Sequence, residues 1–152
     1  MKLTDLLKEQ AVIPGLAGRG KKEVLGELCS ALASQEKVDP EPLLEVLLER
    51  EKLGSTGIGD GIAIPHGKSD NIDKILIAFG RSLAGVDFDS LDGQPVHLFF
   101  LILAPGNATG IHLKVLAKIS RLLKDISFRK ELLAAKGRAE IYKSIASRDD
   151  DF

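Results

Sequence analysis

Two histidines are the residues of this sequence best suited to group-transfer chemistry. His66 lies in the run GIAIPHGKSD, residues 61–70. With a reference pKa of about 6.5 its imidazole is largely neutral at neutral pH, and the ring is a nucleophile once a partner fixes its tautomer. Pro65 fixes the backbone before it, and Gly67 leaves the main chain after it open to an incoming group. A lone histidine in such a place more often bonds only a backbone carbonyl, so His66 needs support from a second group.

His112 supplies that support. It lies in the first turn of a helix predicted to begin near Ile111, after the loop PGNATG at residues 105–110. A helix N-terminus disfavours the protonated ring and offers N–H groups to an anion. A phosphoryl group held between this turn and His66 would be well placed, although a surface histidine at a helix start is an equally good local interpretation. The third histidine, His97, begins an apolar strand and is interpreted as structural.

A nucleotide-binding loop is the competing interpretation of the same segment. The phosphate-binding pattern G-x-x-x-x-G-K-[S/T] has four residues between its glycines. Here five residues separate Gly61 from Gly67, and one of them, Pro65, has no N–H to donate. The spacing of Gly57, Gly59 and Gly61 also fails the dinucleotide pattern. These glycines are interpreted as a tight loop that leads into a strand.

Helices are predicted at both ends of the chain, because apolar residues recur there at helical spacing. The first covers residues 21–34. The second covers residues 40–53, where Asp39 provides the N-cap, Pro40 suits the first turn and Gly54 ends the helix. The remaining helical patterns cover residues 111–123, residues 128–135 behind a Ser127 cap, and residues 138–146, followed by a tail at 148–152 that is expected to fray.

The middle of the chain changes to strand patterns. Residues 75–79 (ILIAF) and 96–103 (VHLFFLIL) are nearly continuous apolar runs, typical of strands covered on both faces. A shorter strand is predicted at 62–65, with His66 in the loop that follows it. Helices at both ends with buried strands between them predict an α/β fold. We expect one domain, residues 1–152, with a mixed β-sheet flanked by helices.

Composition excludes several classes of partner. The 152 residues are 44% hydrophobic and 28% charged, as in one domain with a substantial core. The 21 basic and 22 acidic side chains form no long blocks, which argues against nucleic acid or an anionic membrane as a partner. Cys29 is interpreted as an inert buried thiol in a reducing compartment. The start of the chain lacks the apolar run of a secretory signal, and the longest apolar stretch, 98–104, is too short to span a bilayer. We therefore expect a soluble, cytoplasmic protein that keeps its first residues and does not insert into membranes.

One segment of the sequence is characteristic of a known family. The run REKLGSTGIGDGIAIPHGK, residues 50–68, closely resembles the active-site signature of enzyme IIA domains of the bacterial phosphoenolpyruvate-dependent phosphotransferase system. The resemblance is to the fructose/mannitol family, which includes the nitrogen-regulatory IIA proteins. It extends over nearly the whole chain, through the strand ending LAP at 103–105 and the helix that opens with His112. It implies the fructose/mannitol-type IIA fold, which agrees with the strand and helix patterns.

The resemblance also implies roles for three residues. His66 matches the histidine that takes a phosphoryl group from the phosphohistidine of HPr, or of an HPr-like carrier, and hands it on. His112 matches the second active-site histidine, which helps to position the phosphoryl group. Arg50 matches the arginine found nearby in these domains. Without the resemblance, Arg50 would be interpreted as an exposed helix charge beside Glu49 and Glu51.

Phosphoryl transfer makes further demands on the site. Because negative charge develops on the transferred oxygens, the site must supply positive or N–H groups around them. Backbone N–H groups near Gly67 and at the helix start around His112 are expected to do so. Ser55 and Thr56 could add hydroxyl donors or could simply cap the loop, and Lys68 could add a cation or be an ordinary solvated lysine. Transfer between histidines needs no metal or nucleotide, so no cofactor is predicted.

Three functions remain open at this point. The resemblance implies either a nitrogen-type regulator, in which phosphorylation of His66 controls binding to a target protein, or a sugar-uptake component that passes the phosphoryl group to a IIB domain. A chain without a fused IIB or IIC segment favours the regulator. The third possibility is a metal-dependent hydrolase that uses His66, His112 and Asp60. It is the least supported, because the sequence offers no compact set of metal ligands.

Overall fold

The apolar runs in the middle of the chain form the central strands of a six-stranded mixed sheet, in a computed structural model that describes residues 1–150. β5 (Leu76–Val86) and β6 (Val96–Ala104) pair antiparallel at its centre. The strand order is β1-β5-β6-β3-β2, and β4 pairs with β6 as well. The other strands are β1 (Leu7–Ile13), β2 (Gly57–Gly59), β3 (Ile62–Ala63) and β4 (His66–Lys68). Since β1, β3 and β4 run parallel to their central neighbours, the predicted mixed sheet is confirmed.

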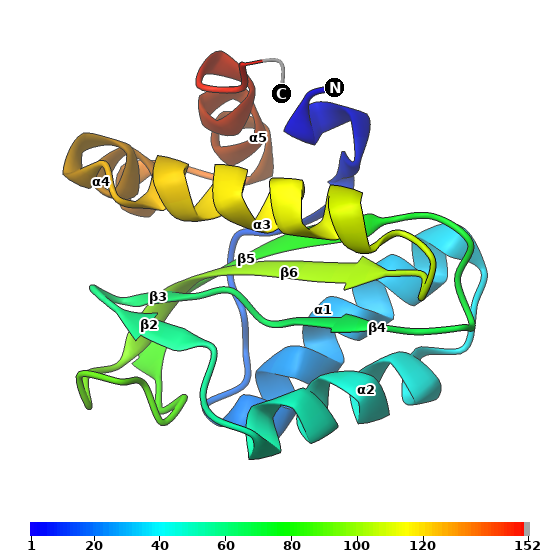
Figure 1. The fold of residues 1–152 in the computed structure, drawn as a ribbon. Coiled ribbons are helices and arrows are strands. Elements are labelled where there is room, and N and C mark those ends of the chain that lie inside the picture. The colour runs from blue at the N-terminus through cyan, green and yellow to red at the C-terminus, as the bar shows by residue number, and fades with distance from the viewer. Residues whose placement is uncertain (151–152) are drawn as a thin grey trace.

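Helices cover both faces of this sheet. One group lies on one side and the other group on the opposite side, with the two ends of the described chain close together (Figure 1). The first group is α1 (Lys21–Glu36) and α2 (Pro40–Lys52), and the second is α3 (Thr109–Leu123), α4 (Ile126–Ala134) and α5 (Arg138–Ser147). A short 3-10 turn, η1 (Leu3–Asp5), precedes β1. None of the helices in residues 1–150 combines the length and the apolar character needed to cross a bilayer.

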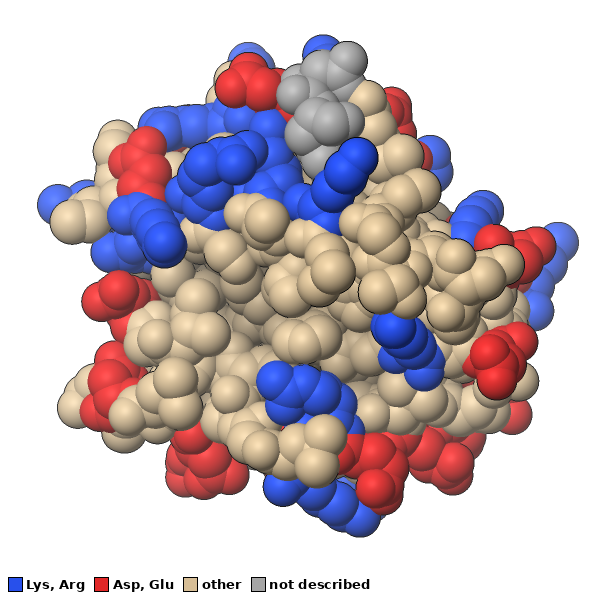
Figure 2. Space-filling model, viewed as in Figure 1, with Lys and Arg blue, Asp and Glu red and all other residues tan. Residues whose placement is uncertain are grey.

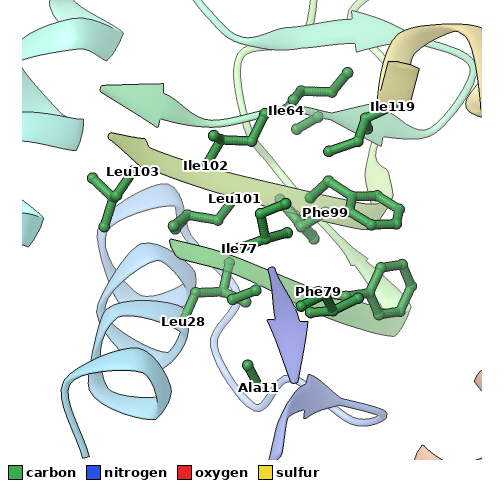
Figure 3. Packing of buried hydrophobic residues seen from close by; sticks show 14 of the residues in the cluster. Ala11, Leu28, Ile64, Ile77, Phe79, Phe99, Leu101, Ile102, Leu103 and Ile119 are labelled. Carbon is green, nitrogen blue, oxygen red and sulfur yellow. The ribbon is translucent and has the colours of Figure 1, made fainter. Parts of the chain in front are cut away.

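The core lies between the sheet and the two helix groups (Figure 3). Phe79 and Phe100 meet edge to face across β5 and β6, with ring centroids 5.0 Å apart. Fully burying a side chain of this kind stabilises the folded state by roughly 1.5–3 kcal/mol. The two central strands are therefore the most firmly packed part of the sheet. Cys29 is fully buried in α1, as predicted, and this burial raises its pKa to about 12, which disfavours the reactive thiolate.

The first strand of the sheet is absent from the sequence prediction, which placed helices at the start of the chain. β1 carries the polar run Lys8-Glu9-Gln10 between its buried ends, so it lacks the alternation expected of a strand. It lies at the edge of the sheet, pairs only with β5, and its register shifts between Leu7 and Val12. An irregular edge strand can tolerate this exposed polar run because one side of it faces solvent.

The two predicted helix caps fare differently in the structure. α2 begins as predicted, with the Asp39 carboxylate accepting from the Glu41 N–H at 3.1 Å. The cap of α4, however, is Asp125 and not Ser127: its carboxylate accepts from the N–H groups of Ser127 and Phe128. A carboxylate two residues earlier fills the N-cap role that the hydroxyl was expected to fill.

The chain after α5 is held in place as far as residue 150, contrary to the predicted fraying at 148–152. Arg148 pairs with Asp125 at 2.6 Å, and with a glutamate of α4. Asp149 is buried and accepts from the N–H groups of Leu3 and Thr4 at 2.7 and 2.9 Å. These contacts tie the end of the chain to its beginning; residues 151–152 lie outside the described part.

Candidate active site

His66 is the first residue of β4. The prediction that it lies in a loop is therefore wrong. The short strand β3 ends at Ala63, and after Ile64 and Pro65 the chain pairs again with the same strand, β6. His66 aligns with Ile102, whose N–H donates to the Pro65 carbonyl at 2.9 Å. The histidine backbone is therefore fixed on the edge of the firmest strand pair, while its side chain stays half-buried.

One hydrogen bond determines the tautomer of the His66 ring. Its Nδ1 lies 2.8 Å from the Ile64 carbonyl oxygen. Because a carbonyl can only accept, the ring nitrogen must be the donor. In the neutral ring Nδ1 then carries the proton, and the lone pair of Nε2 remains available.

His112 lies beside this ring. The two ring centroids are 5.7 Å apart, with the planes at 82°. His112 is the fourth residue of α3, and its backbone N–H donates to the Ala108 carbonyl at 2.9 Å. This N–H is therefore not available to an anion, contrary to the expectation for the helix start. The side chain is only 6% exposed. Burial, and then the neighbouring His66 and Lys68, lower the pKa of His112, which favours the neutral ring.

Two adjoining cavities open beside His66. The larger is about 420 Å³ and contains most of the predicted site residues; it is lined by Val46, Glu49, Arg50, Leu53, His66, Gly67, Lys68 and His112. The smaller is about 200 Å³ and is lined by Arg50, Ser55, Thr56, Ile58, Ile64, His66, Leu116 and Ser120. Figure 2 shows this face of the molecule as a hollow of mainly uncharged side chains with basic side chains at its border. His66 and Arg50 line both cavities.

The two basic side chains of the larger cavity are anchored by the chain itself. Arg50 lies in the last turn of α2 and donates from Nη1 to the Gly54 carbonyl at 2.9 Å. Lys68 lies in β4 and donates from Nζ to the Thr109 hydroxyl at 2.8 Å, at the start of α3. The structure therefore brings both cations together with the two histidines around one cavity.

Ser55 and Thr56 lie beside the smaller cavity, but their hydroxyl groups are already engaged. The Ser55 hydroxyl donates to the Phe88 carbonyl at 2.7 Å and accepts from the Gly57 N–H at 3.0 Å. Thr56 is 3% exposed and its hydroxyl donates to the Glu51 carboxylate. Of the two roles considered for these residues, the contacts correspond to fixing the loop. Glu51 itself is buried, although no role was assigned to it from the sequence.

Gly67 allows the close approach of β4 to α2. A Cβ atom added at Gly67 would lie 2.6 Å from Cγ1 of Val46, a distance that real side chains do not tolerate. The backbone of Gly67 belongs to the sheet, since it aligns with Leu103 of β6. The glycine is therefore needed for packing directly beneath the larger cavity.

Replacing Gly67 with alanine is expected to destabilise the protein by about 1–3 kcal/mol, because the stiff Val46 side chain cannot rotate away from the new methyl group. Urea unfolding measures this difference. The double variant Gly67→Ala with Val46→Ala should recover much of the loss. Gly26→Ala is the control: this helical glycine has open space around its Cβ position, so its substitution should cost nothing. An equal loss in both glycine variants would contradict the packing argument.

The hydrolase alternative finds no ligand set in the described chain. Asp60 lies in the turn between β2 and β3, where its N–H donates to the Asp92 carboxylate at 3.2 Å. Among residues 1–150 no three His, Cys, Asp or Glu side chains are grouped so that they could hold a metal ion. Geometry thus gives no support to a metal centre built on His66, His112 and Asp60.

Comparison with known proteins shows the family of this chain. Residues 5–148 match the family described as phosphoenolpyruvate-dependent sugar phosphotransferase system, EIIA 2. The chain is 45% identical over 146 residues to a nitrogen regulatory protein of Bradyrhizobium diazoefficiens, covering 96% of this chain and 95% of the relative. It is 41% identical over 150 residues to the fructose-specific EIIABC component of Bacillus subtilis, covering 98% of this chain and 24% of that larger protein.

A solved structure gives the same answer for the fold. The chain superposes on the nitrogen regulatory protein IIA-Ntr from Neisseria meningitidis with a TM-score of 0.88 and 34% identity, covering 94% of this chain and 98% of that one. The α/β fold that the sequence predicted is thereby confirmed. Family match, relatives and structure all agree with the resemblance carried by residues 50–68, and the chain belongs to the EIIA 2 family of the phosphoenolpyruvate-dependent sugar phosphotransferase system.

Proposed function

We propose that this protein is a phosphocarrier that accepts a phosphoryl group on Nε2 of His66 from the phosphohistidine of HPr or of an HPr-like carrier. The hydrogen bond between Nδ1 and the Ile64 carbonyl carries the proposal. It fixes the tautomer whose Nε2 lone pair is free, and a fixed tautomer is what a nucleophilic imidazole requires. The family supports a phosphotransfer role in general terms.

The transfer step balances without an added reactant. The Nε2 lone pair of His66 forms a bond to phosphorus as the bond between phosphorus and the carrier's histidine nitrogen breaks. The electron pair of that bond returns to the carrier's nitrogen. Nδ1 keeps its proton throughout, held by the Ile64 carbonyl. Since a loose transition state mainly needs aligned nitrogens and stabilised oxygens, the site has to position groups more than it has to perform chemistry.

Arg50 and Lys68 are proposed to offset the charge of the transferred oxygens. Both line the larger cavity with His66 and His112. A guanidinium group offers paired N–H donors to a phosphoryl group, and an ammonium offers a point charge. The neutral His112 ring can donate one N–H to the phosphoryl group. Because it is neutral, it adds no positive charge beside the His66 ring. Glu49 also lines the cavity, and its negative charge repels a bound anion, which favours release of the phosphoryl group.

Phosphorylation of His66 is expected to raise the pKa of His112. In the free protein this pKa is lowered by burial and by positive neighbours; an adjacent phosphoryl dianion favours the protonated ring instead. An NMR titration of the ring Cε1–H signals in both states measures the change. His97 is the internal control, because its Nδ1 donates to the Ser82 carbonyl away from the cavities. Unchanged titration of His112 would contradict its proposed place beside the phosphoryl group.

The lowered pKa of His112 also predicts a pH dependence of stability. As pH falls below about 6.5, the unfolded chain binds a proton at this histidine before the folded chain does. The free energy of unfolding therefore falls towards acid pH, and His112→Asn should flatten this part of the stability profile.

Exposed apolar side chains surround the two cavities and are proposed to receive the carrier. Leu53 borders the larger cavity and is 84% exposed; Ile58 borders the smaller and is 48% exposed. Ile111 and Leu113, on either side of His112, are also exposed. An apolar rim of this kind suits a brief protein complex that must bring two small sites together.

A nitrogen-type regulatory role is the favoured form of this function. It is supported by the relative that matches over nearly its whole length and is named a nitrogen regulatory protein. In that role, the state of His66 decides which target protein binds. Sugar uptake with transfer to a IIB domain is the second candidate, supported by the 41% identity to a fructose-specific component.

The function is tested by phosphorylating the protein with phosphoenolpyruvate, enzyme I and HPr and then adding a fructose-type IIB domain. Intact-mass spectrometry follows the acid-labile phosphoryl group. A group that is gained from HPr and then remains in the presence of IIB supports the regulator. Rapid loss to IIB supports the sugar component. A wild-type protein that gains no phosphoryl group with its cognate HPr contradicts both.

A further inference from the structure

Glu51 occupies a position where a charged side chain is costly. It follows Leu43 and Leu47 at four-residue spacing on the buried face of α2, and only 8% of it is exposed. A buried carboxylate destabilises the fold unless hydrogen bonds and a cation compensate it. The partners of Glu51 therefore indicate what the residue is for.

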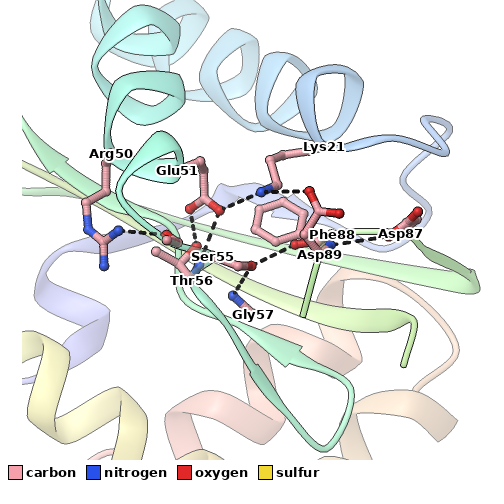
Figure 4. Close-up of polar contacts among 10 residues, drawn as sticks. Lys21, Arg50, Glu51, Ser55, Thr56, Gly57, Asp87, Phe88 and Asp89 are labelled. Carbon is pink, nitrogen blue, oxygen red and sulfur yellow. Dashed lines mark hydrogen bonds and ion pairs between the residues drawn. The ribbon is translucent and has the colours of Figure 1, made fainter. Parts of the chain in front are cut away.

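These partners lie in the loop after α2 and at the start of α1 (Figure 4). The Glu51 carboxylate accepts from the backbone N–H of Thr56 at 3.2 Å and from the Thr56 hydroxyl. Lys21 lies 3.1 Å from the same carboxylate, and its Nζ also reaches Asp89 at 3.4 Å. The Glu51 carboxylate thus joins the end of α2 to the start of α1, and Lys21 extends this link to the segment between β5 and β6.

The loop fixed in this way contains two carbonyl groups that accept hydrogen bonds from residues lining the cavities. The Gly54 carbonyl accepts from Arg50 at 2.9 Å. The Thr56 carbonyl accepts from the N–H of Ile64 at 3.0 Å. The carbonyl of that same Ile64 accepts from Nδ1 of His66 at 2.8 Å. From Glu51 to the reacting ring there are only two intervening residues, each linked by a hydrogen bond.

We infer that Glu51, acting through Thr56, is a positioning residue for phosphoryl transfer, an inference that rests on the proposed function of His66. The Glu51 carboxylate fixes the position of Thr56, and the Thr56 carbonyl fixes the backbone of Ile64. The Ile64 carbonyl in turn keeps the proton of His66 on Nδ1. The same loop aims Arg50 at the cavity through Gly54. Glu51 touches neither the phosphoryl group nor the ring, so its effect appears in the tautomer of His66 and in the transfer rate.

The variant Thr56→Val tests this chain of contacts, because it removes the hydroxyl and keeps the shape of the side chain. The ring nitrogens of His66 are observed by long-range ¹H–¹⁵N correlation at about pH 8, well above the reference pKa of histidine. We expect part of the His66 population to move its proton to Nε2, and the transfer rate from phosphorylated HPr to fall by about tenfold or more. Thr56→Ser, which keeps the hydroxyl, should restore both properties.

Thr4→Val is the matched control. The Thr4 hydroxyl donates to the Asp149 carboxylate at 2.8 Å and its N–H donates to the same group at 2.9 Å, so it repeats the Thr56 arrangement away from the site. This variant should lose stability without changing the His66 tautomer or the transfer rate.

Three outcomes are informative. A shifted tautomer and a slower transfer in Thr56→Val alone support the inference. An unchanged tautomer with a rate within about twofold of wild type, or equal slowing by Thr4→Val, overturns it. A wild-type protein that accepts no phosphoryl group refutes the proposed function instead, and the ring-nitrogen spectra of the unphosphorylated variants still decide whether Glu51 and Thr56 fix the His66 proton.

Discussion

His66→Ala is expected to abolish the acid-labile phosphoryl group that the wild-type protein gains from phosphoenolpyruvate, enzyme I and HPr. Among the described residues 1–150, the variant removes the one histidine whose tautomer is fixed by a hydrogen bond and which lines both cavities. Loss of a nucleophile has no partial substitute in the site, so the rate should fall by at least about a thousandfold. Intact-mass spectrometry measures the adduct directly.

His112→Ala and His97→Ala are the comparison variants for this result. His112→Ala should still gain one phosphoryl group, more slowly, because His112 contributes a donor and not the bond to phosphorus. His97→Ala should be phosphorylated at the wild-type rate. A full adduct on His66→Ala would show that the phosphoryl group is carried elsewhere. Thermal unfolding of each variant separates loss of reaction from loss of fold.

Arg50→Ala is expected to have the second largest effect, a loss of about 10²–10³ in the transfer rate, as when one donor to a developing oxyanion is removed. The guanidinium lines both cavities and is aimed by the Gly54 carbonyl. Rapid-quench measurement of transfer from phosphorylated HPr gives the rate at limiting protein concentration.

Two further variants give the Arg50 result its meaning. Arg50→Lys keeps the charge but loses the paired donors, so it should recover only part of the rate. Arg19→Ala removes an exposed arginine that lines neither cavity, and it should leave transfer unchanged. Equal losses in Arg19→Ala and Arg50→Ala would indicate a general effect of net charge on the approach of the carrier and would contradict a local role.

Local signals in the sequence were sufficient for most helices and for the central strands. Asp39 and Pro40 define the start of α2 through a cap and a fixed backbone angle, both of which act within a few residues. β6 and the first half of β5 are evident in the sequence because their side chains are buried and almost all apolar. The second half of β5, to Val86, extends beyond the predicted strand because it contains polar and exposed residues. β1 gives no such signal, since its polar residues face solvent at the sheet edge and only its pairing with β5 makes it a strand.

The site depended more on contacts between distant segments. The sequence placed His66 in a loop because a three-residue strand is defined only by its partner, β6. The approach of His66 to His112 joins β4 to α3 and was suggested by the family resemblance. The sequence does contain a signal for Glu51. The apolar stripe of Leu43 and Leu47 continues at this position, and a carboxylate there requires an internal partner.

Identification of the phosphorylated nitrogen tests the proposed role of His66 most directly. Protein labelled with ¹⁵N-histidine is phosphorylated through HPr, and a through-bond ³¹P–¹⁵N correlation is recorded. The account predicts one correlation, from phosphorus to Nε2 of His66, with the proton on Nδ1. A bond to Nδ1 of His66 would contradict the tautomer fixed by the Ile64 carbonyl, and a bond to His112 or His97 would contradict the assignment of the acceptor itself.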